Sequence, residues 1–407
     1  MKKRYISFCI LMFSLFAAHA DLYKPHRIFE IGVDAGLSAA DSYWGVGDVL
    51  QKAITIDLSK IAKEMPKDGF VLGFYDREQV FLNLNLSSHM RMGVSAGVEA
   101  TSQFSISKDL FELLGSGLKV GSTKSIKVNG YADVFADVSV FFQTIINDFG
   151  VKIMPTYFIP LVYVPSTSMT ATVSTTQSGK IRANAEANVD IYTAVDMYSV
   201  VENSAAPSVD VAEILSNGGF DLTFEMERNW LHGLNAGFYT RIPILPGTLT
   251  HKMSTRVYAW FEESNLMGYL NDSESHDYDS GHDDFTYSDG ECKAYRPLKL
   301  GINASYAPFG EWLKVQPMVG FAVRNPYSSD MVIYPEYALD VQLSLLRMLY
   351  LNVGTAYMSQ IYQQRIGIGV NLRVIELIAQ ASLSSTDFQH CFNLNGAGVF
   401  VGFRMGF

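Results

Sequence analysis

The twelve residues from Gly396 to Phe407 constrain the fold more than any other stretch of the sequence. They read GAGVFVGFRMGF, and apolar residues fall on every second position: Val399, Val401, Phe403, Met405 and Phe407. Successive side chains of a strand point to opposite faces, so one face is apolar and the other is small or charged, with Phe400 as the exception. Such a terminal strand is rare in soluble proteins, whose termini usually fray into water. A closed barrel in lipid needs it, because every strand must be paired.

This ending resembles the C-terminal recognition signal of bacterial outer-membrane β-barrels, in which apolar residues alternate up to a terminal aromatic residue. The resemblance implies that the barrel assembly machinery is a partner of the chain and that residues 399–407 carry the signal. The last strand of a soluble β-sandwich would show the same alternation, so a soluble periplasmic β-protein stays open as an alternative.

Residues 1–20, MKKRYISFCILMFSLFAAHA, have the three parts of a secretory signal peptide. A basic start is followed by an apolar run from Tyr5 to Ala17 and by the small-x-small triplet Ala18-His19-Ala20. We therefore expect cleavage between Ala20 and Asp21. The apolar run is too short to favour a retained membrane anchor.

The composition of the exported chain favours a membrane barrel. Only 18% of the residues are charged and 13% are aromatic, and aromatic residues form girdles at both interfaces of such barrels. Removal of the three basic residues of the signal peptide changes the net charge from −10 to −13 (−10 − 3), which argues against a nucleic-acid partner. No run of eighteen apolar residues follows Asp21, so we expect no transmembrane helix. We predict a bacterial outer-membrane location, in contact with outer-membrane lipid.

From Val80 onward the alternation recurs and predicts an all-β fold: a transmembrane antiparallel β-barrel of about 14 strands, with 12 to 16 open. The longest alternating run, Ile126 to Phe142, exceeds the roughly ten residues that cross a bilayer. By contrast, Val46 to Met65 has helical spacing and stops at Pro66. We therefore divide the chain into a signal peptide (1–20), an N-terminal hatch-like or periplasmic segment (21–68) and the barrel (69–407).

The polar parity of a barrel strand faces the lumen. The candidate lumen-lining residues are Asp133, Asp137, Arg182, Glu186, Asp190, Arg365 and Arg373. They carry both signs, so they can pair and fill the lumen instead of forming a single-sign ring that selects ions. The same parity carries aromatic residues that would suit a plug or an apolar ligand: Phe135, Phe141, Tyr258, Trp260, Tyr350 and Phe400. A slip of one residue at a bulge would turn them outward instead.

Prolines interrupt the segment from Gly150 to Thr175 at Pro155, Pro160 and Pro165. Proline removes a ladder hydrogen bond from a central strand. We therefore expect a kink, a bulge or a partly irregular loop in this segment.

Few residues suggest chemistry. Cys292 and Cys391 remain after signal removal, either as a disulfide or as two separate buried thiols. The acidic segment 271–291 reads as an extracellular loop, and we predict a solvated charge run with no metal, because its spacing does not match an EF-hand. Calcium binding stays open as an alternative, through Asp277, Asp279, Asp283, Asp284 and Asp289. The sequence contains no GxSxG, HExxH, P-loop or paired CxxC motif, so we expect neither an enzyme nor a cofactor.

The length, the pre-barrel segment and the phrase Ser107-Lys108-Asp109-Leu110-Phe111-Glu112-Leu113 resemble distant barrels of the FadL-type long-chain fatty acid transporter superfamily. The resemblance implies a 14-stranded barrel with an N-terminal hatch that takes up hydrophobic small molecules passively, with long-chain fatty acids as the expected ligand. The Asn-Pro-Ala element of that hatch has no match between Asp21 and Pro66, and no ligand residue is carried over.

Two other functions remain open. A general diffusion porin would have an open lumen and a measurable ion conductance. A non-transporting surface barrel, such as an adhesin or an assembly partner, would bind through segment 271–291 while its lumen stays shut.

Overall fold

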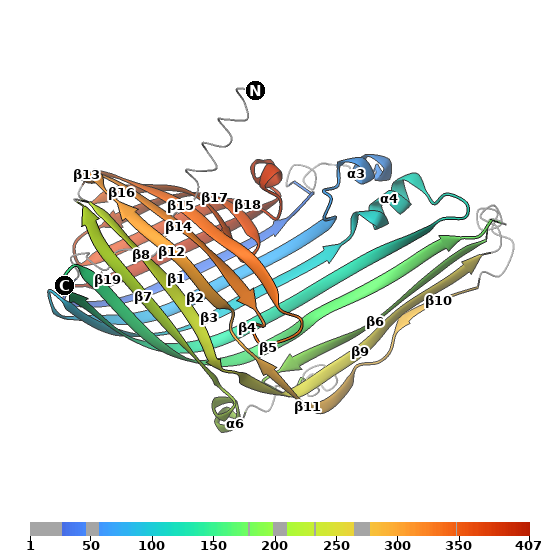
Figure 1. Ribbon diagram of the computed structural model, residues 1–407, viewed down its shortest axis with the longest axis horizontal. Helices are drawn as coiled ribbons and strands as arrows, with labels where there is room; N and C mark the ends of the chain where they lie inside the picture. The colour runs from blue at the N-terminus through green and yellow to red at the C-terminus, as the bar shows by residue number, and fades with distance from the viewer. Residues whose placement is uncertain are drawn as a thin grey trace.

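The computed structural model describes residues 27–45, 57–177, 180–197, 210–231, 233–263, 277–346 and 348–407. Fourteen of its strands form a closed antiparallel barrel (Figure 1). In order around the wall they are β1 (Phe29–Asp41), β2 (Phe70–Ser87), β3 (Met90–Ile106), β4 (Thr123–Ile146), β5 (Phe149–Thr175), β7 (Gly219–Leu231), β8 (Leu234–Leu245), β12 (Leu298–Tyr306), β14 (Leu313–Arg324), β15 (Val332–Leu346), β16 (Leu349–Met358), β17 (Ile361–Asn371), β18 (Ile375–Ser385) and β19 (Gly396–Gly406).

The first and last strands close this barrel. β1 pairs with β19 from Glu30↔Gly406 to Ala40↔Gly396 and with β2 on its other side. The barrel therefore begins at Phe29, and the predicted boundary at residue 69 is wrong. The sequence does predict a possible strand from Ile28 to Ser38, and β1 confirms it. The error was to place this strand outside the barrel wall, where Gly32, Gly36 and several alanines replace the large apolar residues that usually mark a wall strand.

The wall separates an apolar exterior from a polar interior. Side chains such as Val353, Ile366 and Val401 point outward, and Val401 is 55% exposed. Their neighbours of opposite parity point inward, as the pleat requires. β16 and β17 have 10 and 11 residues, which matches the roughly 9–11 residues that cross a bilayer.

Aromatic side chains border the apolar exterior band at both ends. At one end Tyr337, Tyr357 and Tyr362 contact one another across three strands, with ring centroids 5.5 and 4.2 Å apart. At the other end Phe29 and Phe407 lie 5.9 Å apart. Such girdles mark the two interfaces of a transmembrane barrel. The end with the C-terminus has the short turns, as the periplasmic end of outer-membrane barrels does, and on that basis we name the two ends of this barrel periplasmic and extracellular.

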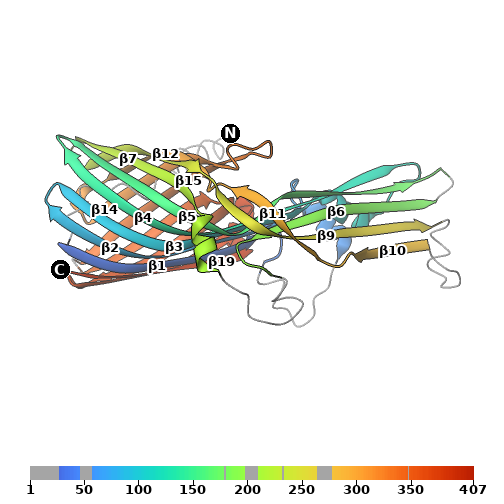
Figure 2. The same cartoon turned by 90° about the horizontal axis from the view of Figure 1, so that it is seen from below.

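A sheet projects from the opposite, extracellular end of the barrel (Figures 1 and 2). β4 and β5 continue beyond the barrel for part of their 24 and 27 residues. Beside them lie β6 (Ile181–Thr193), β9 (Gly247–Glu263), β10 (Asp277–His282) and β11 (Thr286–Ala294), in the pairings β5–β6, β6–β9, β9–β10 and β9–β11. We call this sheet the extension. β10 and β11 occupy much of segment 271–291, so the prediction of a loop there is wrong.

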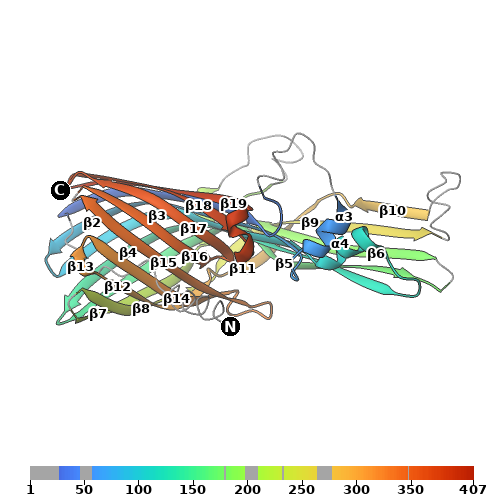
Figure 3. The same ribbon diagram turned by 90° about the horizontal axis from the view of Figure 1, so that it is seen from above.

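Helices are short and lie near the rim. α3 (Leu58–Glu64) and α4 (Lys108–Ser116) pack on each other outside the extracellular end of β2 and β3 (Figure 3), through Ile61, Ala62, Met65 and Phe111. The other described elements are α6 (Val211–Ser216), the 3₁₀ helix η1 (Phe388–Asn393) and the four-residue strand β13 (Pro308–Glu311). None of the described helices is long and apolar enough to cross a membrane. Of the predicted helix 46–65, residues 46–56 lie outside the described part.

Strand β5 runs through the three predicted breaks. Pro155 pairs with Leu222 of β7, and the register of β4 against β5 shifts at Val134/Phe135 and again at Gly130/Ala132. The prolines thus produce bulges instead of a loop. At this level β5 exchanges its partner, because it pairs with β7 up to Phe158 and with β6 from Val162 onward.

Deleting Phe407 should lower the yield of closed barrel several-fold. Its backbone N–H and carbonyl exchange two 3.1 Å hydrogen bonds with Phe29, at the seam where β1 pairs with β19. The heat-dependent mobility shift of folded barrels on gels would measure this yield. The exposed Phe392 of η1 provides the control, since Phe392→Ala leaves the seam intact; an undiminished yield after deletion would contradict the role of the seam.

Both described cysteines are free: Cys391 is buried in η1 and Cys292 lies in β11. Burial raises the pKa of the Cys391 thiol to about 12 and that of Cys292 to about 11. Because the thiolate is the reactive form, iodoacetamide should label the folded chain from Asp21 onward very slowly at neutral pH. Denaturation without reductant should then release two reactive thiols. Their absence after denaturation would show a disulfide instead.

Candidate functional site

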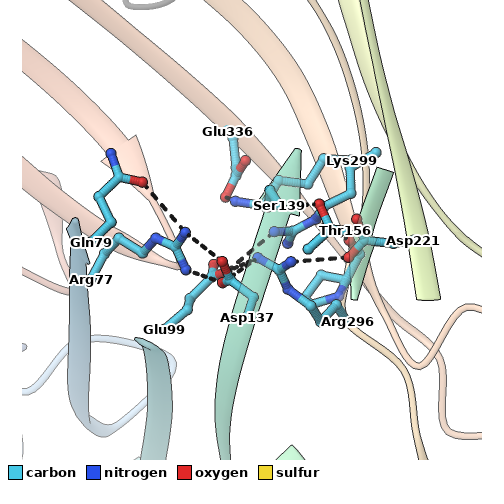
Figure 4. A network of polar contacts seen from close by, with 12 residues as sticks. Arg77, Gln79, Glu99, Asp137, Ser139, Thr156, Asp221, Arg296, Lys299 and Glu336 are labelled. Carbon is cyan, nitrogen blue, oxygen red and sulfur yellow. Dashed lines mark hydrogen bonds and ion pairs between the residues drawn. The ribbon is translucent and has the colours of Figure 1, made fainter. Parts of the chain in front are cut away.

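Charged side chains fill the barrel lumen at the level of its extracellular half. Eight of them form what we call the central network: Arg77, Glu99, Asp137, Asp221, Arg241, Arg296, Lys299 and Glu336 (Figure 4). They project from β2, β3, β4, β7, β8, β12, β15 and the residue pair that precedes β12. Four acids thus face four bases, and the network is neutral as a whole.

Arg296 lies at the centre of this network and is only 4% exposed. Its guanidinium contacts three carboxylates from three strands: Nη2 lies 2.9 Å from Glu99 and 3.3 Å from Asp137, and Nη1 lies 3.0 Å from Asp221 (Figure 4). Burial of a charge is costly unless partners surround it. One cation therefore holds three strands of the wall to the segment that enters β12.

Further pairs extend the network toward the walls. Arg77 binds Asp137 through both terminal guanidinium nitrogens: Nη1 donates to Oδ2, and Nη2 donates to Oδ1 at 3.2 Å. Arg241 lies 3.2 Å from Glu99, and Lys299 lies 2.9 Å from Glu336. Paired charges of both signs across the lumen block a water-filled path and offer no single-sign ring to select ions.

A second cross-lumen contact lies at the mouth. Arg324, the last residue of β14, binds Asp133 of β4 through Nε–Oδ2 and Nη2–Oδ1 contacts of 2.6 and 2.7 Å. Its guanidinium also lies over the rings of Tyr131 and Tyr163, at 4.3 and 5.1 Å. Nη1 donates to Ser166 Oγ at 2.9 Å. We call these five residues the mouth clamp.

An apolar cluster adjoins both charged groups. Phe135, Phe158, Tyr163, Leu249 and Ala294 pack together, with the rings of Phe135 and Phe158 5.6 Å apart and nearly perpendicular. We call this set the mouth cluster. On β4, Phe135 lies between Asp133 and Asp137 on the inward face, so the cluster has the mouth clamp on one side and the central network on the other.

Ion pairs continue through the periplasmic half of the lumen. Arg404 lies 3.6 Å from Asp34 and 3.9 Å from Glu376. The other pairs are Arg91–Glu30 at 3.6 Å, Lys152–Glu225 at 3.0 Å and Arg365–Asp340 at 2.9 Å. The lumen wall is therefore polar along its length, apart from scattered aromatic rings.

The structure divides the seven predicted lumen residues. Asp133 lies in the mouth clamp, Asp137 in the central network, and Arg365 faces the lumen beside Asp340. Arg182, Glu186 and Asp190 lie on β6 in the extension, outside the lumen, where they pair with residues of β9. The prediction failed there because a sheet with one wet face shows the same alternation as a barrel wall.

Arg373 is also misplaced by the prediction. It occupies the tight turn between β17 and β18 with φ +69°, and its carbonyl accepts a 2.7 Å hydrogen bond from Arg27. The turn lies at the periplasmic end of the barrel. The alternating pattern of β17 ends two residues earlier, at Asn371, which is the only local sign of the turn.

The predicted inward aromatic residues fall into two groups. Phe135 is part of the mouth cluster, Phe141 lies 5.6 Å from the Arg91 guanidinium, and Tyr350 donates to Glu376 at 2.8 Å. Phe400 faces the lumen beside Gly36, where an added Cβ would lie 3.1 Å from its ring. The remaining two, Tyr258 and Trp260, belong to the extension.

Sequence reasoning missed most of the central network and Arg324. Arg77 and Glu336 lie on the inward parity of recognisable strands, so alternation could have found them. Arg296 belongs to no strand, and Arg324 ends one. Arg296 is 197 residues from Glu99 and 75 from Asp221, and Arg324 is 191 residues from Asp133. No local pattern links residues so distant.

Replacing Arg296 by Met should destabilise the barrel by about 3–5 kcal/mol, because three buried carboxylates lose their shared cation. Denaturant unfolding in detergent micelles would measure the loss. Lys293→Met is the matched control: this lysine is exposed, and its pair with Glu291 at 3.7 Å should contribute below about 1 kcal/mol. Equal stability of the two variants would contradict the assigned role of Arg296.

No family model matches the sequence, and no curated protein matches it. Among solved structures, the chain is similar to a FadL homologue of Pseudomonas aeruginosa, with 10% identity and a TM-score of 0.45 over 95% of this chain and 92% of that one. It is also similar to the toluene transporter TodX of Pseudomonas putida, with 9% identity and a TM-score of 0.40 over 95% and 91% of the chains. For the toluene transporter TbuX of Ralstonia pickettii the identity is 8% and the TM-score is 0.42, over 95% of this chain and 90% of that one. The similarity to FadL-type barrels is distant.

Proposed function

We propose that this protein is an outer-membrane transport barrel that takes up small hydrophobic molecules by passive movement, and that long-chain fatty acids are its ligands. One observation supports the proposal. The mouth cluster lies between two buried arginines, Arg324 and Arg296, and ion pairs close the lumen elsewhere. This arrangement matches a molecule with an apolar chain and a carboxylate.

The mouth cluster supplies the apolar half of the proposed site. Phe158 and Leu249 have no exposed surface, and Phe135 is almost fully buried. A hydrocarbon chain that inserted among these side chains would gain about 0.8 kcal/mol for each buried methylene group. A long chain is therefore favoured over a short one.

The arginines supply the polar half. Arg324 lies above the mouth cluster and Arg296 lies below it, and each is neutralised by aspartate or glutamate carboxylates. A fatty acid carboxylate has the same charge and geometry as those groups, and guanidinium binds carboxylates through two parallel hydrogen bonds. Such a ligand can exchange with a resident carboxylate without leaving an arginine unpaired.

The closed lumen argues against a general diffusion porin. Porins keep a water-filled channel, whereas the central network joins opposite walls through Arg296 and its three carboxylates. Passage of a ligand must therefore be coupled to rearrangement of wall side chains.

The extension favours a second candidate function, which is binding of a partner at the cell surface. Its four added strands stand outside the barrel, and β6 carries a polar face that includes Arg182, Glu186 and Asn188. A surface-binding barrel would keep its function when the mouth cluster is altered, whereas a transporter would lose it.

Binding and uptake of oleate would test the proposal. Phe158→Ala should weaken oleate binding to the purified protein at least tenfold, because a buried phenylalanine contributes roughly 1.5–3 kcal/mol of apolar contact and 1.4 kcal/mol is a factor of ten. The same variant should slow oleate entry into proteoliposomes. Phe321→Ala, on the lipid-facing side of β14, is the matched control. Oleate uptake no faster than in protein-free liposomes would refute the transport proposal.

A further inference from the structure

The mouth clamp is the strongest described connection across the extracellular end of the lumen. It joins β14 to β4 and β5, which lie five and four positions away around the barrel wall. Arg324 is 2% exposed and makes two charge-assisted hydrogen bonds to Asp133, in addition to a 3.0 Å bond from Nη2 to the Val164 carbonyl. Charge-assisted bonds are roughly twice as strong as neutral ones.

The other described connections at this level carry no net charge. Asn325 of the β14–β15 loop also bonds to Tyr163 of β5, and the ring of Tyr327 lies 5.0 Å from that of Tyr295. Gln360, in the turn between β16 and β17, donates to Tyr131 Oη at 2.7 Å. Tyr327, in the loop between β14 and β15, donates to the Pro243 carbonyl at 2.9 Å. Each contributes about 1 kcal/mol net. Arg324 makes the strongest of these connections and therefore contributes most to the position of the β14–β15 loop over the mouth.

We propose that Arg324 is the gate residue of the mouth: a ligand carboxylate replaces Asp133 on its guanidinium, and this exchange releases the β14–β15 loop. The inference rests on the proposed function, because it needs a ligand that carries a carboxylate. It assigns a carboxylate-binding site to Arg324 and gives the ligand a means of opening its own path.

The exchange is coupled to opening by the burial of Asp133. In the closed state this carboxylate is 5% exposed and is neutralised by Arg324. If a ligand takes Arg324, Asp133 is left as a buried unpaired charge, which is strongly unfavourable. Opening of the mouth removes this cost, because water then reaches Asp133. A carboxylate ligand therefore binds the open state better than the closed one, which is the condition for shifting the population.

The two tyrosines of the clamp keep the arginine available during the exchange. Tyr131 and Tyr163 lie against the Arg324 guanidinium by cation–π contacts, which do not use its N–H groups. Tyr163 also belongs to the mouth cluster. The carboxylate site and the apolar site are thus adjacent, so one amphipathic molecule can occupy both.

The loop itself is built to move as a unit. Asn325, which follows Arg324, has φ +51°, and its amide donates to Asp330 at 3.1 Å across the loop. A left-handed non-glycine residue next to the clamp marks a place where the chain changes direction sharply. Releasing Arg324 loosens the loop at this residue without breaking its internal hydrogen bond, and the bond between Asn325 and Tyr163 of β5 must break with it.

Distance measurements between two spin labels would test the gate. Labels would be attached to Ser329→Cys in the β14–β15 loop and to Thr170→Cys in β5, both exposed, in the full mature chain with Cys292→Ser and Cys391→Ala. We expect a narrow distance distribution without ligand and a longer one with oleate. Arg324→Ala should show the longer distribution without any ligand. Arg365→Ala is the control, because its pair with Asp340 lies on one wall and does not span the mouth.

The uncharged analogue oleyl alcohol separates this inference from the proposed function. If the gate is correct, oleyl alcohol leaves the labels at the closed distance while oleate moves them. If oleate binds and enters liposomes but Arg324→Ala stays at the wild-type distance, the gate is refuted and the transport proposal stands. If neither oleate nor oleyl alcohol binds, both proposals fail. The heat-dependent gel shift would show that each variant is folded.

Discussion

The structure depends on the pairing of charges inside the barrel. A 14-stranded wall encloses a lumen, and in this chain ion pairs fill that lumen where a porin would hold water. Arg296 alone joins β3, β4 and β7 to the start of β12 through three carboxylates. Because the charges of the central network pair between different elements, these pairs fix which parts of the wall face each other across the lumen. The exterior needs no such specificity, since lipid accepts any apolar side chain.

The long strands link this interior to the cell surface. β4 carries Asp137 of the central network, Phe135 of the mouth cluster and Asp133 of the mouth clamp on one face, and then continues into the extension. The charged and apolar groups therefore form successive levels along a single strand. A molecule approaching from outside would meet the clamp first, the apolar cluster next and the central network last. The mouth cluster and Arg324 are therefore the first groups that such a molecule can bind.

Local patterns in the sequence predicted the barrel but not its interior connections. Alternation located most wall strands and the count of fourteen, because the period of two follows directly from the pleat. It left the possible strand at Ile28 to Ser38 outside the barrel, where Gly32 and Gly36 weaken the pattern, and it assigned Arg182, Glu186 and Asp190 to the lumen although they lie in the extension. Arg296 and Arg324 were missed because one precedes a strand and the other ends one, and their partners lie 75 to 197 residues away in sequence. Parity tells which face a residue occupies, and only the closed fold tells what stands opposite.

The most direct test of the central claim is the single-channel conductance of the mature protein in a planar bilayer. If paired charges close the lumen, the inserted wild-type barrel should carry almost no steady current at moderate voltage, and weakening of the pairs by high salt should produce only brief openings. A large, steady conductance at low salt would contradict the account, because it would show a continuous water-filled path through the central network.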